Sequence, residues 1–188
     1  MEEQAADKET IITQTENWVR KVIIGHNYCP FAKREIELKT VRYQIVEKPD
    51  INSGLERLVE ECIYLDEHSS IETTLIIYPV GLGNFESYLD FYYLAEELLV
   101  TRGYRGVYQI ASFHPEYCFQ GSENNDAANY TNRSPYPMLH IIREASIEKV
   151  LEHYPEPEKI PQRNIEFSRS KGLSKMEKLL HDCFKLEE

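Results

Sequence analysis

Three short strand-like runs separated by two helical stripes constrain the fold of this chain most. The runs are 41–47, which alternates apolar and polar side chains, 73–78, which is apolar and β-branched, and 106–111. Between them, 55–63 carries apolar residues at helical spacing and 85–100 forms a long apolar helix. Such alternation is typical of right-handed crossovers. It predicts an α/β fold with a small, mostly parallel, three-stranded sheet flanked by helices.

The segments outside this core carry further signals. One extra strand fits the pattern between residues 34 and 40. Three more helices are expected: over 11–24, from Pro137 to about His153, and over 169–188. The chain is therefore predicted to form a single domain over 1–188, with a core of about 11–168 and extra C-terminal helices, of which 169–188 is peripheral.

Composition and charge exclude several classes of function. The 188 residues are 41% hydrophobic and carry a formal net charge of −11, which disfavours binding to nucleic acid or to anionic membranes. The first residues are polar and acidic, and no apolar run reaches the ~20 residues of a membrane span. We expect a soluble, cytoplasmic protein whose four cysteines form no disulfides.

A long polar stretch, residues 112–137, follows the third predicted strand. Long loops within a compact domain tend to be functional, and ligands bind beyond the carboxyl ends of parallel strands. His114 lies at that position, and an imidazole that titrates near neutrality suits proton transfer. The alternative is a packed histidine that binds a backbone carbonyl.

The helix expected from Pro137 suggests an anion site. Arg133 and Ser134 precede its first turn, His140 lies within it, and a helix start attracts phosphate or carboxylate. His140, Arg143 and Glu144 then share one helical face. The alternatives are an ordered cap with Arg133 paired to an acid, and a structural ion pair between Arg143 and Glu144.

Cys29 lies in a tight loop before Pro30 and outside any apolar stripe. It is a nucleophile if a nearby His or Arg lowers the pKa of its thiol, and otherwise a small buried apolar residue. Metal binding has scattered candidates, but no ligand spacing typical of a known site; they are His26, His114, Glu116, Cys118 and Asp126. We therefore predict no metal site, and no cofactor follows from the sequence.

Four stretches of this sequence carry a resemblance to a known family. They are Val22 to Gly25 with Asn27 and Cys29 to Ala32, Ser112 to Pro115 with Tyr117, Phe119 and Gly121, Asn129 to His140, and Arg143 to Glu148. They resemble a bacterial family known as a domain of unknown function, numbered fourteen-fifteen, over roughly residues 12 to 168. The family has no established activity.

The resemblance implies which positions to consider. Those that match its motifs are Cys29, Pro30, His114, Tyr117, Asn129, Tyr130, Asn132, Arg133, Ser134, His140, Arg143 and Glu144. Cys118 and His26 depart from the family pattern, which weakens any role for them. Cys29, His114 and His140 are thus the candidate catalytic residues, and the remaining polar positions are candidate ligand-binding residues.

Three hypotheses follow for function. The first is an enzyme that acts on a small anionic metabolite, bearing phosphate or carboxylate, by Cys/His chemistry. The second is a non-catalytic metabolite-binding or regulatory module with the same anion pocket. The third is a structural role, in which the polar string fixes the long loop to the sheet and function lies in a partner interface. The sequence predicts neither a reaction nor an oligomeric state.

Overall fold

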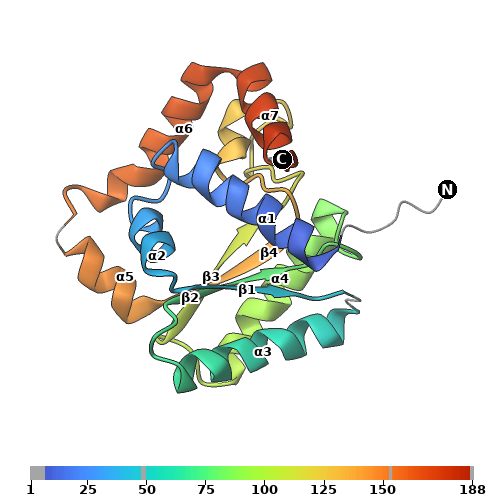
Figure 1. The fold of residues 1–188 in the computed structure, drawn as a ribbon, viewed down its shortest axis with the longest axis vertical. Coiled ribbons are helices and arrows are strands. Elements are labelled where there is room, and N and C mark those ends of the chain that lie inside the picture. The colour runs from blue at the N-terminus through green and yellow to red at the C-terminus, as the bar shows by residue number, and fades with distance from the viewer. Residues whose placement is uncertain (1–6, 48–49, 153, 187–188) are drawn as a thin grey trace.

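The protein is a four-stranded sheet with helices on both faces, described by a computed structural model over residues 7–47, 50–152 and 154–186. Helices α3 and α4 cover one face, and α1, α2, α6 and α7 lie on the other (Figure 1). The strands are β1 (Val41–Ile45), β2 (Thr73–Ile77), β3 (Tyr108–Phe113) and β4 (Met138–Arg143). The α-helices are α1 (Lys8–Trp18), α2 (Ala32–Leu38), α3 (Ile51–Glu67), α4 (Phe85–Thr101), α5 (Glu144–Leu151), α6 (Ile160–Lys171) and α7 (Leu173–Asp182). A π-helix, η1 (Val19–Ile24), extends α1, and η2 (Ala127–Thr131) and η3 (Pro157–Lys159) are 3₁₀ turns.

The predicted sheet is wrong in strand number and in direction. The strand order is β1-β2-β4-β3, and of its three pairs β1–β2 is parallel while β2–β4 and β4–β3 are antiparallel. Strands β1, β2 and β3 correspond to the three expected runs and share one direction. The sheet is nevertheless mostly antiparallel, because β4 inserts between β2 and β3.

The helix expected from Pro137 to His153 is also wrong in its first half. Residues Met138–Arg143 form β4 at the centre of the sheet, and α5 begins at Glu144. His153 lies outside the described residues. The central position of β4 explains the difference: the run pairs on both sides, with β2 and with β3, and these hydrogen bonds override a helical spacing of apolar residues.

Two further segments differ from expectation. The extra strand proposed between residues 34 and 40 is absent there, because this stretch lies largely in α2 (Figure 1). Helix α6 was not predicted, since its first turn follows a run of prolines and its sequence is polar. The helix expected over 11–24 is confirmed, although its last six residues form the π-helix η1.

The N-termini of the long helices are fixed by side chains that the sequence supplies. Asp7, Asp50 and Asn84 each accept a hydrogen bond from the backbone N–H three residues later, at 2.8 to 2.9 Å. Such caps satisfy N–H groups that have no partner within the helix. They explain why α1, α3 and α4 begin where they do.

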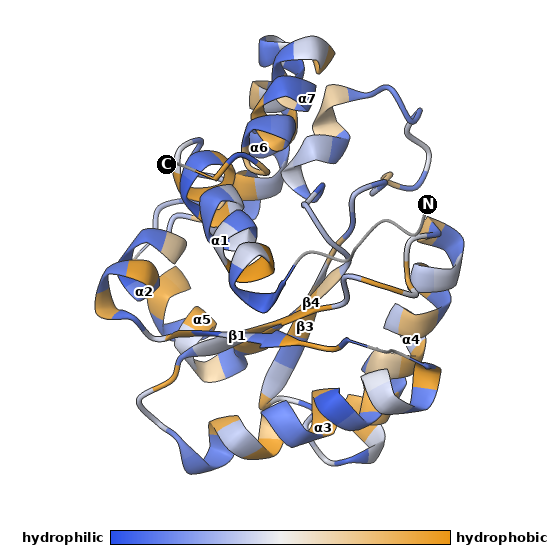
Figure 2. Cartoon of the chain, turned by 45° about the vertical axis from the view of Figure 1, so that its right-hand side comes forward, coloured by the Kyte–Doolittle hydropathy of each residue, from blue (hydrophilic) through white to orange (hydrophobic). Residues whose placement is uncertain are grey.

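Two apolar cores lie on opposite faces of the sheet, and Figure 2 shows the apolar residues that run along its strands. Because side chains alternate along a strand, β4 sends Leu139 and Ile141 to the α3–α4 face. It sends Met138 to the opposite face, where Trp18 and Met176 also lie. Helix α7 therefore contributes to the core beside α1. No helix within the described part of the chain is long and apolar enough to cross a membrane.

Candidate functional site

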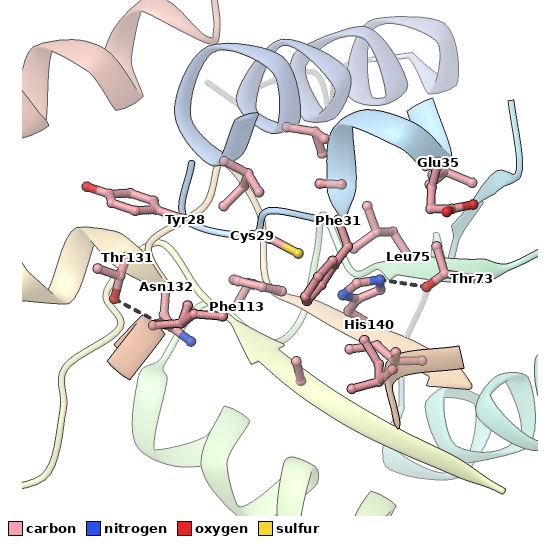
Figure 3. Close-up of a pocket in the computed structure, with 18 of the residues that line it drawn as sticks. Tyr28, Cys29, Phe31, Glu35, Thr73, Leu75, Phe113, Thr131, Asn132 and His140 are labelled. Atoms are coloured by element: carbon pink, nitrogen blue, oxygen red, sulfur yellow. Dashed lines mark hydrogen bonds between the residues drawn. The ribbon is translucent and has the colours of Figure 1, made fainter. Parts of the chain in front are cut away.

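A cavity of about 830 Å³ opens between the sheet and the helices on the α1 side. Its floor is the sheet, where β2, β3 and β4 contribute Thr73, Leu75, Ala111, Phe113, His140 and Ile142. Its walls come from η1, the loop that carries Cys29, and helices α2, α5 and α6 (Figure 3). Small-molecule sites commonly have volumes of roughly 300–1,000 Å³, so the cavity has the size of a ligand site.

The interior of the cavity is predominantly apolar. Val19 and Ile23 line it from η1, Ile147 from α5 and Ile165 from α6. Of the charged lining residues, Arg34 and Lys149 are largely exposed, which places them at the rim where the cavity meets solvent, and Glu35 and Glu72 are half-buried. A molecule bound inside would therefore exchange water mainly for apolar contacts.

His140 is the most informative polar group on the floor. Its Nε2 lies 2.6 Å from the Thr73 hydroxyl oxygen, and that hydroxyl donates its single hydrogen to the Ile141 carbonyl. The hydroxyl must then accept from the ring, so the hydrogen is on Nε2 and the lone pair is on Nδ1. No described residue hydrogen-bonds to Nδ1, which points away from Thr73 in Figure 3.

The imidazole of His140 is neutral at physiological pH. Burial penalises its charged form and lowers its pKa from 6.5 to about 4. The residue keeps some accessible surface because it lines the cavity. His140 therefore presents a fixed hydrogen-bond acceptor to the interior, in the tautomer that Thr73 selects.

Cys29 lies on the wall opposite the floor, and its thiol points into the cavity (Figure 3). Burial raises the pKa of this thiol, while the backbone N–H groups of Phe31 and Ala32 partly oppose that effect. The thiol is therefore protonated at neutral pH. It shares this largely apolar cavity with an imidazole that has an unbonded lone pair.

The Cys29 loop is held in place by α6. Asn164 donates to the Tyr28 carbonyl at 2.8 Å, and Arg163 donates to the carbonyl of Asn27, whose backbone is left-handed with φ 54°. The Tyr28 hydroxyl lies 2.6 Å from the Ser168 hydroxyl. The residues of α6 that hold this loop were not predicted from the sequence. The one sequence signal for them is a pair of polar residues, Asn164 and Ser168, one helical turn apart.

The π-helix η1 leads into the same loop. Short π-helical segments frequently occur at functional sites. The wider turn ends at Gly25, where a Cβ atom would meet the Lys21 carbonyl oxygen at 2.4 Å. Glycine is therefore required for the chain to leave the helix toward Cys29.

Of the predicted site residues, Cys29, His140 and Asn132 line the cavity. Asn132 donates to the Ser112 carbonyl at 3.2 Å, and its side-chain oxygen accepts from the Thr131 hydroxyl at 3.0 Å. These bonds fix Asn132 between the long loop and β3. The other predicted residues lie elsewhere.

His114 is fully buried outside the cavity. Its Nδ1 accepts from the Glu116 N–H at 3.0 Å, so Nε2 carries the hydrogen and donates to the Leu82 carbonyl at 2.9 Å. Burial lowers its pKa. Both ring nitrogens are bonded, and this is the arrangement of a structural histidine.

Arg133 joins separate parts of the long loop to one another. Its guanidinium donates to the carbonyls of Tyr117 and Asn124 and to the Tyr130 hydroxyl, at 2.9 to 3.1 Å, and stacks over the Tyr130 ring. Asn129 bridges the Phe119 N–H and the Glu123 carbonyl within the same loop. These contacts are those expected of a structural role.

The expected helical face of His140, Arg143 and Glu144 is wrong, because the strand sends His140 and Arg143 to opposite faces of the sheet. Arg143 donates to the Leu65 and Ile71 carbonyls, at 2.6 and 3.0 Å, where α3 ends. Glu144 is the first residue of α5.

Ser134 is fully buried and donates to the Tyr136 carbonyl at 2.6 Å. The predicted anion site depended on a helix N-terminus at Pro137, but the strand β4 begins at Met138 and the helix α5 begins only at Glu144. Among the described residues, no group of three or more His, Cys, Asp or Glu side chains is arranged to hold a metal ion. All four cysteines are free.

Comparison with known proteins adds a family whose function is unknown. The family model described as "Protein of unknown function (DUF1415)" matches residues 10–178. No curated protein matches this sequence, and no solved structure matches it.

Proposed function

We propose, for a chain that belongs to the family described as "Protein of unknown function (DUF1415)", that the cavity binds a small, largely apolar molecule. One observation carries the proposal: an apolar space of about 830 Å³ contains, on its floor, a neutral histidine whose Nδ1 has no hydrogen-bond partner among the described residues. Ligand sites typically combine apolar walls with a few fixed polar groups.

The polar end of the ligand follows from the tautomer of His140. Because Nδ1 accepts hydrogen bonds, it favours a hydroxyl, an amide N–H or an amine N–H over a carboxylate or phosphate. A charged group placed deep in the cavity would lose its hydration without a partner. The anionic metabolite expected from the sequence would have to keep its charge at the rim, near Arg34 and Lys149.

A matched pair of probes tests this proposal. N-phenyl-1-naphthylamine is neutral and has one N–H donor, whereas 8-anilinonaphthalene-1-sulfonate has the same rings and a negative charge. Trp18, the single tryptophan of the chain, lines the cavity, so its fluorescence reports binding of either probe. We expect the neutral probe to bind at least about tenfold more tightly.

A filling variant locates the binding. Ala111 lies on the cavity floor, and Ala111→Leu occupies part of the space, so it should abolish binding of the neutral probe. Ala145→Leu is the matched control, because Ala145 is exposed on α5 and does not line the cavity. Tighter binding of the sulfonate would favour an anionic ligand, and binding that survives Ala111→Leu would contradict the proposal.

A further inference from the structure

The cavity is lined by both a thiol and an imidazole, and no hydrogen bond joins the two in the described part of the chain. The Cys29 thiol points into it from the loop, and the Nδ1 lone pair of His140 is unbonded on the floor (Figure 3). The thiolate form of a cysteine is the nucleophile, and an adjacent base is the usual means of producing it from a buried thiol. Both groups are neutral at rest.

The neutrality of the pair restricts the class of reaction partner. Phosphates and carboxylates are poor candidates, because the lining cations Arg34 and Lys149 lie at the rim and not in the interior. Arg34 also forms an ion pair with Glu35 there, at 2.7 Å. An uncharged electrophile with an apolar body fits the walls. A carbon–carbon double bond conjugated to a carbonyl group is uncharged and accepts a thiol without a leaving group or an oxidant.

We propose that Cys29 adds covalently to small, apolar, α,β-unsaturated carbonyl compounds bound in the cavity, with His140 carrying the proton. This inference rests on the proposed function and names its substrate class. The S–H bond breaks, and Nδ1 receives the proton. Sulfur bonds to the β-carbon as the double bond opens, and the proton passes to the α-carbon. The product is a neutral thioether, and atoms and electrons balance within the pair of reactants.

The other cysteines provide internal controls. Cys62 and Cys183 are fully buried in the two apolar cores, and burial raises the pKa of each thiol. Cys118 is partly accessible like Cys29, but its thiol lies 3.4 Å from the Ser122 carbonyl in the long loop, outside the cavity. A preference that arises from the cavity should therefore appear at Cys29 and not at Cys118.

The test measures modification rates by peptide mass spectrometry. The probes are N-phenylmaleimide and N-(2-hydroxyethyl)maleimide, two unsaturated carbonyl compounds that differ in an apolar or polar tail. Each rate is divided by the rate of the same probe with glutathione. We expect Cys29 to prefer the phenyl probe by about tenfold, the effect of burying the ring, and Cys118 to show no preference.

Two variants separate the chemistry from binding. In His140→Gln the side-chain amide can still donate to Thr73 but offers no base, so the Cys29 rate should fall by at least about tenfold. Cys29→Ser should abolish the preference of the chain for the phenyl probe, and binding of N-phenyl-1-naphthylamine to the wild-type chain is measured alongside as the readout of the proposed function. An unreactive Cys29, or one without preference for the phenyl probe, overturns this inference while probe binding leaves the proposed function intact. An unchanged rate in His140→Gln overturns the role of His140. Loss of probe binding to the wild-type chain overturns both.

Discussion

The two faces of the sheet use the same strands and are filled very differently. On the α3–α4 face, Leu58, Phe91 and Ile141 are buried, and a Cβ atom on Gly54 would meet the Phe91 ring at 2.9 Å. On the α1 face, Ile77 and Met138 are buried in the second core, but Leu75, Ala111 and His140 of the same strands form the floor of a cavity of about 830 Å³.

The difference supports the proposal that the cavity holds a ligand. Side chains that line an empty space lose dispersion contacts, so an unfilled face lowers stability. The packed face shows that this sheet can be covered closely. On the cavity face, the small side chain of Ala111 and the polar side chains of Thr73 and His140 occupy positions that larger apolar residues would fill. These residue choices favour a binding site.

The largest expected effect compares two neighbours on β4. Ile141 is fully buried on the packed face, whereas Ile142 is partly exposed to the cavity. Ile141→Ala should lower the free energy of unfolding by roughly 2–5 kcal/mol, and Ile142→Ala by about 1 kcal/mol, because little new empty space is created there. Urea unfolding measures both, and equal losses would mean that the two faces are packed alike.

The next effect depends on pH. His140 has a pKa of about 4 in the folded chain and near 6.5 when unfolded, so the unfolded state binds more protons between these values. The contribution of His140 to the free energy of unfolding is fully present above pH 6.5 and decreases as the pH falls toward 4. At pH 5 this contribution has decreased by about 2 kcal/mol. Between pH 7 and pH 5, the free energy of unfolding should therefore fall by about 2 kcal/mol less in His140→Gln than in the wild-type chain, as measured by urea unfolding. Identical pH dependence in both proteins would place His140 in a solvated environment.

The smallest effect compares two alanines that become leucine. Ala95 is fully buried on α4, and the added atoms should cost roughly 1–3 kcal/mol there. Ala111→Leu should change the free energy of unfolding by less than about 1 kcal/mol, since the cavity accepts the side chain. Thermal unfolding of the two variants measures this difference between the packed face and the cavity face. A larger loss of stability in Ala111→Leu than in Ala95→Leu would contradict it.

Local periodicity predicted much of the fold. The runs 41–47, 73–78 and 106–111 gave real strands, and the stripes 55–63 and 85–100 gave α3 and α4. Sheet direction was not predictable, because β4 is short and its apolar residues fit helical spacing as well as a strand. Its pairing with β2 and β3, distant in sequence, decides its conformation.

The candidate site was predicted in part. Cys29, His140 and Asn132 were named and line the cavity. Arg133 and Arg143 were named for their charge, but their guanidinium groups bind backbone carbonyls. A sequence does not show whether an arginine meets a ligand or the chain itself, and it gives no sign of an empty space. The cavity and the fastening role of α6 depend on tertiary packing.

The most direct test of the central claim is methyl NMR of the chain titrated with N-phenyl-1-naphthylamine, with isoleucine and leucine methyl groups labelled. The account predicts shifts at Leu75, Ile142 and Ile147, which line the cavity, and none at Leu58 and Ile141 across the sheet. Shifts on both faces, or on neither while the probe binds elsewhere, would contradict the claim that this cavity is the binding site.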